Sequence, residues 1–575
     1  MRKTIKRLGA VLLAMAMAVS VLCTGALAAD TYSITVTNTT AGYTYQAYQI
    51  FAGTLGDKDT NKTETPLGIT DWGSGLKGNE SDLIKALQSD ATIGSLFDNV
   101  LTHGTATLDA SNAIVAQNVA AVISKDTFTS EYTKVFAKIV GNNVNTTVAG
   151  TANTVTGEGD NAGYHIGLKD AGYYLVKNSA VPTGNEAYTN YILKVVGNEK
   201  VENKSSVPTV DKKVKNSANT DETDATGTTA SIGDTVTFTL TGTLPDKYAD
   251  YNTYKYVFHD TLDAGLTLKS DSITVYKNSI EEANKIDTGK YNVKTSGLTD
   301  NCTFEVAFED LKKSGLALDK SSKIIVVYSA TVNENAIIGT DGNKNTVKLE
   351  YSNDPNWGGG ENEPTGNTPE SYVKVYSTGL KLQKIDGQTK AALTGAKFTI
   401  EGTTHQIGYT YRPSDSGTYY KQADGRYSTT APENSENVTK YERIEATTEQ
   451  QKFTATAEVG SDGTLVIRGL GAGTYTITEI VAPTGYNLLK DPVTITITGT
   501  ATNDGVTWTV KKDSESLSPD IKDNHLYLLQ VQNNKGSTLP STGGMGTKLF
   551  YTIGGILMAG AAIVLVVRKR RSDAE

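Results

Sequence analysis

The stretch Asn345-Thr-Val-Lys-Leu-Glu-Tyr351 alternates polar and apolar side chains at a period of two. Alternate side chains of a strand share one face, so Val347, Leu349 and Tyr351 are expected on a buried face. Similar stretches recur along the chain, separated by turn residues and without the alternation of strands and helices that a parallel sheet needs. The pattern predicts a mainly β protein built from tandem immunoglobulin-like sandwich domains.

The composition agrees with this fold class and excludes one class of partner. The 575 residues include 30 Tyr, 11 Phe and 3 Trp, and aromatic and β-branched residues favour strands. The formal net charge is −9 although both ends of the chain are basic. A body this acidic cannot displace phosphate counterions, so nucleic-acid binding is not expected.

The first 29 residues have the features of a secretory signal peptide. A basic start precedes an apolar run over 8–22, and Ala26-Leu-Ala28 provides small residues for cleavage. Cys23 would leave with this segment. The remaining chain would keep Cys302 as its single cysteine and could form no internal disulfide, so a secreted protein of this kind needs another form of stabilisation.

The C-terminal end carries a second targeting pattern. Leu539-Pro540-Ser541-Thr542-Gly543 precedes an apolar span over 549–567 and a basic cluster over 568–571. The span is long enough to cross a bilayer, and the cluster would stay inside the cell. This order resembles the LPXTG sorting signal of Gram-positive surface proteins, which implies sortase cleavage between Thr542 and Gly543 and secretion to the cell wall. A simple single-span anchor is the alternative.

Strand and turn patterns divide the chain as follows: signal peptide 1–29, N-terminal domain 30–207, middle domain 208–354, linker 355–369, third domain 370–536 and sorting signal 537–575. The N-terminal domain also contains helix-like apolar spacing over 80–87 and 110–124. It is therefore expected to mix strands with some helix, whereas the two following domains are expected to be sandwiches.

In the middle domain, three polar residues share strand faces with apolar neighbours. Lys212 is two residues from a valine on each side and so shares their strand face. Asn345 shares a face with Val347, Leu349 and Tyr351, and Asp260 shares one with Phe258 and Leu262. A buried lysine or carboxylate is unfavourable unless it is paired or neutral.

The third domain repeats the pattern. Lys384 shares a strand face with two leucines, and Glu479 shares one with Tyr475 and Ile477. Asn533 shares a face with Val531, whereas its neighbour Asn534 points the other way.

Two interpretations of these residues remain open at this point. They could form buried salt bridges, or strand-end side chains that extend to solvent. Alternatively, burial gives a neutral lysine amine and a protonated acid. The amine could then attack the asparagine carbonyl, release ammonia and leave a Lys-Asn isopeptide bond.

The motifs around these residues are similar to those of a known family. Residues 208–212 and 345–355 resemble the isopeptide-forming middle domain of Gram-positive sortase-assembled backbone pilins. Residues 384–386, 393–398, 473–479 and 482–486, with Asn533, resemble the collagen-adhesin B-type domain that ends such pilins. The resemblance implies crosslinks from Lys212 to Asn345 and from Lys384 to Asn533, promoted by Asp260 and Glu479, each joining the first strand of a domain to its last.

The resemblance also implies a lysine that joins subunits. Val201-Glu-Asn-Lys204 stands where the family has a Val-Tyr-Pro-Lys type motif, and Lys204 would accept the Thr542 acyl group of the next subunit. Lys200 is a competing choice. The implied function is a structural shaft subunit of a cell-surface pilus that supports adhesion.

The implied partners are pilus and housekeeping sortases, identical subunits, minor or tip pilins, peptidoglycan and a host surface ligand. A monomeric or minor wall-anchored adhesin is the alternative. The five histidines show no metal-binding spacing, so we expect no metal, no cofactor and no enzyme activity beyond the autocatalytic crosslinks.

Overall fold

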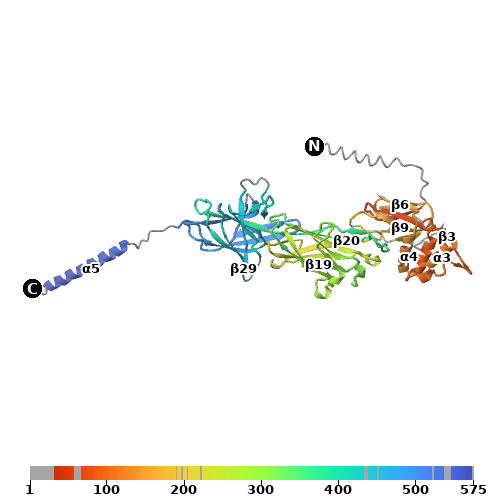
Figure 1. Cartoon of the computed structure of the whole chain (residues 1–575), viewed down its shortest axis with the longest axis horizontal. Coiled ribbons are helices and arrows are strands. Elements are labelled where there is room, and N and C mark those ends of the chain that lie inside the picture. The colour runs from red at the N-terminus through yellow and green to blue at the C-terminus, as the bar shows by residue number, and fades with distance from the viewer. Residues whose placement is uncertain are drawn as a thin grey trace, which may run out of the picture. The chain divides into compact units, whose positions relative to one another are not determined.

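The computed structural model describes residues 32–572 apart from 57–65, 185, 190, 196–198, 204, 220–222, 404, 433–437, 450–451, 521–522 and 537–544. Two compact units divide the chain. The first is the chain up to Ser377 with Gly499–Thr507, and the second is Thr378–Thr498 with the chain from Trp508 onward. Strands dominate both units, which confirms the mainly β fold class (Figure 1).

The N-terminal region of the first unit combines strands with helices. Its elements are β1 (Tyr32–Thr37), β2 (Thr44–Leu55), β3 (Leu67–Trp72), α2 (Glu80–Ser89), η1 (Gly94–Phe97), β4 (Thr102–His103), β5 (Ala106–Thr107), α3 (Ala113–Ile123), α4 (Ser130–Asn143), β6 (Gly150–Ala152), β7 (Val155–Thr156), η2 (Gly159–Asn161), β8 (Gly163–Leu168), β9 (Gly172–Ala180), β10 (Ile192–Val195) and β11 (Glu199–Glu202). One sheet has the order β11-β1-β8-β7 and the other the order β10-β9-β2-β3, with β6 beside β2.

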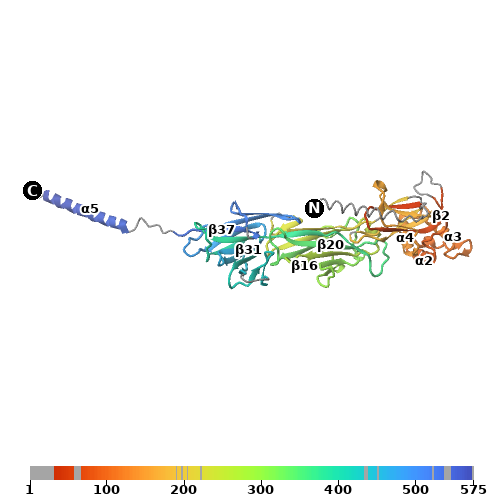
Figure 2. The ribbon, with the colours of Figure 1, turned by 90° about the horizontal axis from the view of Figure 1, so that it is seen from above.

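The helices of this region lie together beside β2 (Figure 2). α2 and α3 are the two helices that the apolar spacing predicted. α4 was not predicted. The Thr129 side chain accepts a hydrogen bond from the Tyr132 amide at its start, which is a typical N-cap. Phe136 and Val140 of α4 are buried in the same apolar cluster as Trp72, so packing stabilises this helix.

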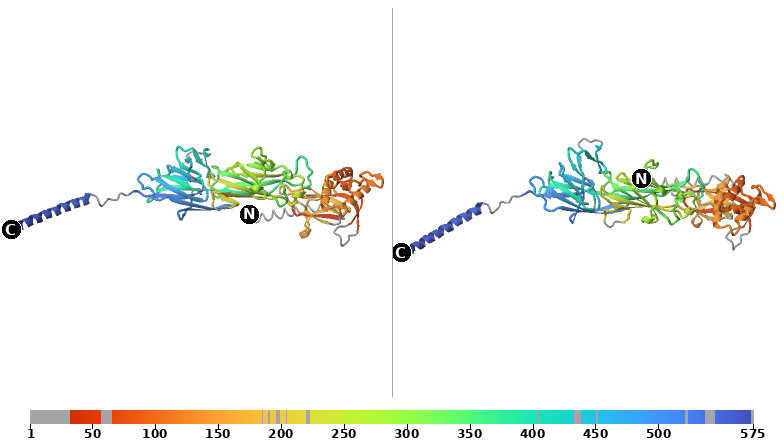
Figure 3. Two further views of the ribbon diagram at one scale, coloured as in Figure 1. Left: turned by 90° about the horizontal axis from the view of Figure 1, so that it is seen from below. Right: turned by 60° about the horizontal axis from the view of Figure 1, so that its bottom comes forward.

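The middle region consists of strands and short 3-10 turns (Figure 3). Its elements are β12 (Val210–Asn216), β13 (Gly227–Thr229), β14 (Thr235–Thr243), η3 (Tyr248–Asp250), β15 (Tyr256–Leu262), β16 (Leu266–Lys277), η4 (Glu282–Asn284), η5 (Thr288–Lys290), β17 (Asn292–Lys294), β18 (Phe304–Phe308), η6 (Leu311–Lys313), β19 (Lys323–Val332), β20 (Asn343–Ser352), β21 (Thr365–Asn367) and β22 (Ser371–Tyr376). The smaller sheet has the order β12-β14-β19-β16. The larger has the order β13-β22-β20-β15-β18-β17, with β21 beside β20.

The boundary expected after the middle domain differs from this arrangement. β21 lies inside the predicted linker over 355–369, and β22 lies inside the predicted third domain, yet both pair with β20. The compact units divide between Ser377 and Thr378. Composition suggested a linker because Gly, Asn and Pro are frequent there, but the backbone groups of β20 need partners on this side and find them in these two strands.

The second unit is a two-sheet sandwich. Its strands are β23 (Thr378–Asp386), β24 (Lys397–Gly402), β25 (Tyr409–Pro413), β26 (Tyr419–Lys421), β27 (Tyr427–Ser428), β28 (Lys440–Ile444), β29 (Thr447–Glu449), β30 (Lys452–Glu458), β31 (Thr464–Leu470), β32 (Gly473–Val481), β33 (Val493–Ala501), β34 (Val506–Lys512), β35 (Glu515–Ser516), β36 (Pro519–Asp520) and β37 (Asp523–Asn533). One sheet has the order β27-β26-β28-β25-β31-β23-β37-β36, and the other β29-β30-β24-β32-β33-β34-β35. Leu380, Phe398, Ile467 and Ile495 belong to the core between them.

The chain continues into a long apolar helix, α5 (Met545–Ser572). Within the described residues, Phe550–Lys569 is the one segment that is long and apolar enough to cross a membrane. This agrees with the span predicted over 549–567.

Candidate functional site

The structure brings together the three polar residues predicted on buried faces of the middle domain. Lys212 lies on β12 in the smaller sheet, whereas Asp260 on β15 and Asn345 on β20 lie in the larger sheet. They are 1%, 0% and 0% exposed, respectively. Strand alternation points all three into the space between the sheets, so they form one site, here called the middle-domain triad.

The atoms of this triad are in direct contact. The Lys212 amine donates a hydrogen bond to Asn345 Oδ1 at 2.6 Å and also contacts Asp260 Oδ2. The amine is therefore held against the carboxamide that it would attack. Lys212 is on β12, the first strand of the middle region, and Asn345 is on β20, which β21 and β22 follow, so a bond here would join the two sheets.

Tyr328 on β19 is a member of the site that the sequence reasoning missed. Its hydroxyl donates to Asp260 Oδ1 at 2.8 Å, accepts from Asn345 Nδ2 at 2.6 Å, and accepts from the Lys212 amine at 3.1 Å. Alternation over 324–332 places Tyr328 among buried apolar residues. A tyrosine on such a face needs a hydrogen-bond partner for its hydroxyl. This requirement could have predicted from the sequence that Tyr328 lies beside the buried polar residues.

Burial sets the electrostatics of the middle-domain triad. The amine of Lys212 lies 5.5 Å from the ring centre of Phe238, and Phe304 packs against Tyr328. Burial lowers the pKa of Lys212 to about 8, although the nearby carboxyl group opposes this shift. Burial also raises the pKa of Asp260. Both shifts favour the neutral forms of the pair.

The second unit holds the third-domain triad, Lys384, Glu479 and Asn533. Lys384 on β23 and Asn533 on β37 lie on neighbouring parallel strands of one sheet, and Glu479 lies on β32 of the other. The three residues are at most 4% exposed. Asn534, by contrast, is exposed, so strand alternation selected the correct asparagine for this face.

The contacts of the third-domain triad differ in one respect from those of the middle-domain triad. The Lys384 amine contacts Asn533 Oδ1 and lies 3.7 Å from Glu479 Oε1. Asn533 Nδ2 donates directly to Glu479 Oε2 at 2.8 Å, without a tyrosine between them. Burial lowers the pKa of Lys384 to about 8. Each domain thus places a lysine amine with a lowered pKa against an asparagine amide. Hydrogen bonds connect that amide to a carboxyl group, through Tyr328 in the middle domain and directly in the third domain.

The predicted residues for joining subunits lie partly outside the described residues. Lys204 and the motif Leu539, Pro540, Ser541, Thr542 and Gly543 are among those the structure does not describe. Lys200 and Glu202 of β11 are exposed and Val201 between them is 9% exposed, so the two polar side chains lie on the outer face of this strand. The Lys200 amine donates to Asn161 Oδ1 at 2.7 Å.

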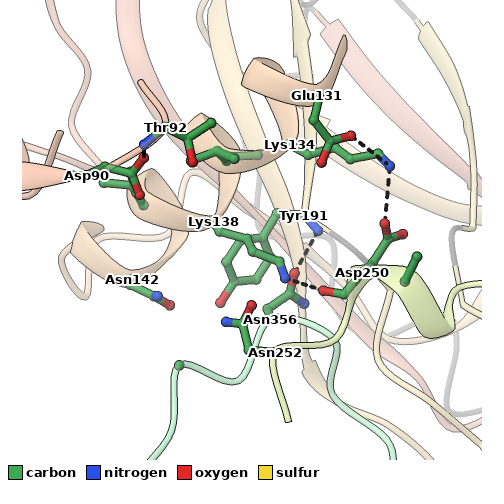
Figure 4. A pocket seen from close by; sticks show the side chains of 15 residues that line it. Asp90, Thr92, Glu131, Lys134, Lys138, Asn142, Tyr191, Asp250, Asn252 and Asn356 are labelled. Carbon is green, nitrogen blue, oxygen red and sulfur yellow. Dashed lines mark hydrogen bonds and ion pairs between the residues drawn. The ribbon is translucent and has the colours of Figure 1, made fainter. Parts of the chain in front are cut away.

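A polar pocket of the first unit is separate from both triads (Figure 4). Lys134 of α4 forms an ion pair with Asp250 at 3.1 Å, and the Lys138 amine donates to the backbone oxygen of the same aspartate. These contacts tie α4 to η3. The residues lining the pocket are mainly paired polar groups without a nucleophile and base in contact, which is typical of a structural contact.

Two family models match segments in the C-terminal third of the chain. Residues 378–514 match the prealbumin-like fold domain family (SpaA), and residues 531–574 match the LPXTG cell wall anchor motif. The second match contains the predicted sorting motif and the apolar helix.

A curated relative extends the similarity. The trypsin-resistant surface T6 protein of Streptococcus pyogenes serotype M6 is 27% identical over 399 residues, which cover 64% of this chain and 70% of the relative. A solved structure of the T6 backbone pilin of serotype M6 Streptococcus pyogenes is similar over 88% of this chain and 98% of that chain, with 17% identity and a TM-score of 0.46.

The chain is similar to the Gram-positive backbone pilins. The full-length major pilin SpaD from Corynebacterium diphtheriae is a further similar structure, with 16% identity, 88% of this chain and 98% of that chain covered, and a TM-score of 0.43. The LPXTG cell wall anchor match and the similarity to the T6 surface protein indicate a secreted protein attached to the cell wall, in surface pili. Its expected immunoglobulin-like architecture is confirmed.

Proposed function

We propose that this pilin is the structural shaft subunit of a covalent pilus and that each of its two triads forms an isopeptide bond. The observation that carries the proposal is the burial of two separate Lys–acid–Asn groups, each with the amine in contact with the amide oxygen. Shaft subunits bear tensile load, and internal crosslinks would take the place of the disulfides that this chain cannot form.

In the middle-domain triad, Lys212 Nζ attacks Cγ of Asn345 as a neutral amine. The new N–C bond forms, the Cγ–Nδ2 bond breaks, and Nδ2 leaves as ammonia. A neutral Asp260 accepts the Lys212 proton at Oδ2 and passes the proton from Oδ1 to Tyr328, which protonates Nδ2. The Tyr328 hydroxyl, which donates to Asp260 Oδ1 and accepts from Asn345 Nδ2, links the acid to the leaving nitrogen and supports this route. Atoms and charge balance without a cofactor.

The third-domain triad follows a shorter route. Glu479 contacts both the Lys384 amine and the Asn533 nitrogen, so one carboxyl group can accept the first proton and supply the second. The Asn533 nitrogen also donates to the Asn487 backbone oxygen at 2.7 Å, which holds the amide plane in place during the attack.

Polymerisation is proposed to use the sorting motif and a lysine of the next subunit. A pilus sortase would cleave after Thr542 and transfer its acyl group to Lys204, or to Lys200 as the alternative. A housekeeping sortase would link the base to peptidoglycan. Minor or tip pilins and a host ligand would complete a fibre that supports adhesion. Head-to-tail joining of identical subunits through two different residues produces an open filament.

Two measurements test this proposal. Full-length chain purified in detergent is digested, and mass spectrometry searches for Lys212 joined to Asn345 and Lys384 joined to Asn533. Each bond lowers the mass by about 17 Da through loss of ammonia. An SDS immunoblot of cell-wall extract then tests assembly: a ladder of covalent multimers supports a shaft, whereas a single monomer band supports the monomeric adhesin.

A further inference from the structure

A group of side chains with metal-binding atoms lies on the opposite face of the larger middle-domain sheet from Asp260. His259 is on β15 and is the cross-strand partner of Glu305 on β18. Asp300 and Cys302 belong to the segment just before β18. One donor atom from each of these four residues lies within 4.8 Å of the others. We call this group the His259 cluster.

The donor atoms converge on one ring nitrogen. His259 Nδ1 lies 3.0 Å from Asp300 Oδ2, 3.4 Å from Glu305 Oε1 and 4.0 Å from Cys302 Sγ. A ring nitrogen has one proton or one lone pair, so it cannot satisfy three neighbours by hydrogen bonding. Ligand bonds of about 2.0 to 2.3 Å to a tetrahedral zinc ion would separate the donors by roughly 3.3 to 3.8 Å.

The other ring nitrogen has the partner that a metal-binding histidine usually has. His259 Nε2 lies 3.3 Å from Glu350 Oε2, and Glu350 in turn accepts a hydrogen bond from Lys255 at 2.9 Å. A carboxylate that accepts the Nε2 proton leaves the Nδ1 lone pair directed at the metal position. Lys348 lies 2.9 Å from Asp300 Oδ2 and orients that carboxylate.

Burial and backbone contacts hold the cluster together. The His259 and Glu305 side chains are each 11% exposed, and Cys302 is 8% exposed. The Thr303 amide donates to the Asp260 backbone oxygen at 2.6 Å, which fixes the segment carrying Cys302 beside β15. The competing state is an ion-pair network in which a protonated His259 lies between the acids and the Cys302 thiol hydrogen-bonds to Asp300. In that state the thiol stays protonated, whereas zinc would bind it as the thiolate.

We propose that His259, Asp300, Cys302 and Glu305 bind one zinc ion. An imidazole, a thiolate and two carboxylates suit a borderline-soft divalent ion that accepts tetrahedral geometry. Binding releases the Cys302 thiol proton, because the thiolate is the ligand. The ion ties β15 and β18 to the preceding segment. From the sequence we expected no metal, because His259 and Cys302 are 43 residues apart and the local spacing matches no metal motif.

The test uses the full chain, purified in detergent and stripped with a chelator. Zinc is titrated against a chromophoric chelator, and cobalt is added separately as a spectroscopic probe. We expect one zinc per chain and a cobalt spectrum with a thiolate charge-transfer band. Cys302→Ser should abolish that band. Glu350→Gln should weaken zinc binding by about 10- to 100-fold, whereas His103→Ala, which changes an exposed histidine outside the cluster, should not change it.

Three results would overturn the proposal. They are a stoichiometry below one, a cobalt spectrum without the thiolate band, and zinc binding that is unchanged in both Cys302→Ser and His259→Ala. Circular dichroism verifies that each variant is folded. If His259→Ala fails to fold, the cobalt band in the wild-type chain still decides the outcome, since it reports the thiolate directly.

Discussion

Asn345 and Tyr328 form a hydrogen bond between the two sheets of the middle domain, with Asn345 Nδ2 donating to the tyrosine hydroxyl at 2.6 Å. That nitrogen is the atom that leaves as ammonia in the proposed crosslinking reaction. The same hydroxyl contacts Asp260, so the tyrosine connects the acid to the leaving group. The third-domain triad makes the equivalent connection without a tyrosine.

Tyr328→Phe should slow crosslinking in the middle domain and leave the third domain unchanged. Phenylalanine keeps the ring packing but removes the proton path to Asn345, and general acid catalysis of this kind contributes about 10²- to 10⁴-fold. Mass spectrometry of chain sampled at intervals after synthesis measures the fraction lacking each bond. Tyr256→Phe is the matched control, since Tyr256 is equally buried but its hydroxyl donates to the Thr243 backbone oxygen. Equal rates in Tyr328→Phe and wild type would remove the tyrosine from the mechanism.

The two acids should act independently. Asp260→Ala should prevent the Lys212–Asn345 bond and Glu479→Ala the Lys384–Asn533 bond, because each carboxyl group contacts the amine of its own triad and belongs to a different domain from the other triad. Each variant should keep one ammonia that the wild type loses. Its mass, after correction for the substitution, should therefore exceed that of the wild type by about 17 Da. The double variant should be about 34 Da heavier. Full crosslinking in either single variant would show that the carboxyl group is not required.

Asn345→Leu should destabilise the middle domain by removing the crosslink while keeping the pair of Lys212 with Asp260. The bond closes a loop with a sequence separation of 133 residues, and the chain-entropy treatment gives about 5 kcal/mol for such a loop. Urea unfolding monitored by tryptophan fluorescence and by protease resistance measures the loss. Asn533→Leu supplies the comparison for the other unit. A midpoint unchanged from wild type in both variants would argue that no bond had formed.

Lys204→Arg should convert the multimer ladder to monomer while leaving both internal bonds in place. Arginine keeps the positive charge but stays protonated, so it cannot act as the nucleophile. The immunoblot of cell-wall extract is the measurement, and Lys200→Arg is the matched variant. If the ladder persists in Lys204→Arg and disappears in Lys200→Arg, Lys200 is the joining residue. Persistence in the double variant would exclude both.

Deletion of 539–543 should leave the pilin held by its apolar helix and absent from the wall fraction. The span Phe550–Lys569 is retained in this variant, so the chain still stops in the membrane, but sortase has no peptide to cleave. Fractionation of membrane and wall with antibody detection measures the distribution. Normal amounts of wall-linked pilin after the deletion would contradict the role assigned to Thr542.

Much of the triad geometry could be predicted from sequence because side chains alternate along a strand. That rule alone placed Lys212, Asp260 and Asn345 on buried faces, and it selected Asn533 over Asn534. It could not show which strands lie opposite one another, since a pairing between distant strands depends on sheet order. The position of Asn345 on β20, with β22 beside it in the same sheet, could not be read from the pattern of one strand for this reason.

Sequence by itself determined the mainly β class, the C-terminal sorting signal and the buried faces on which the six triad residues lie, because these depend on local periodicity and on contiguous motifs. Tertiary structure decided which residues of other strands contact these residues. It placed the Tyr328 hydroxyl between Asp260 and Asn345, and it paired β15 with β18 so that His259 and Cys302 lie close together. Such contacts arise from the packing of strands that are far apart in the chain, and the energy of that packing is shared among many residues rather than carried by any local pattern.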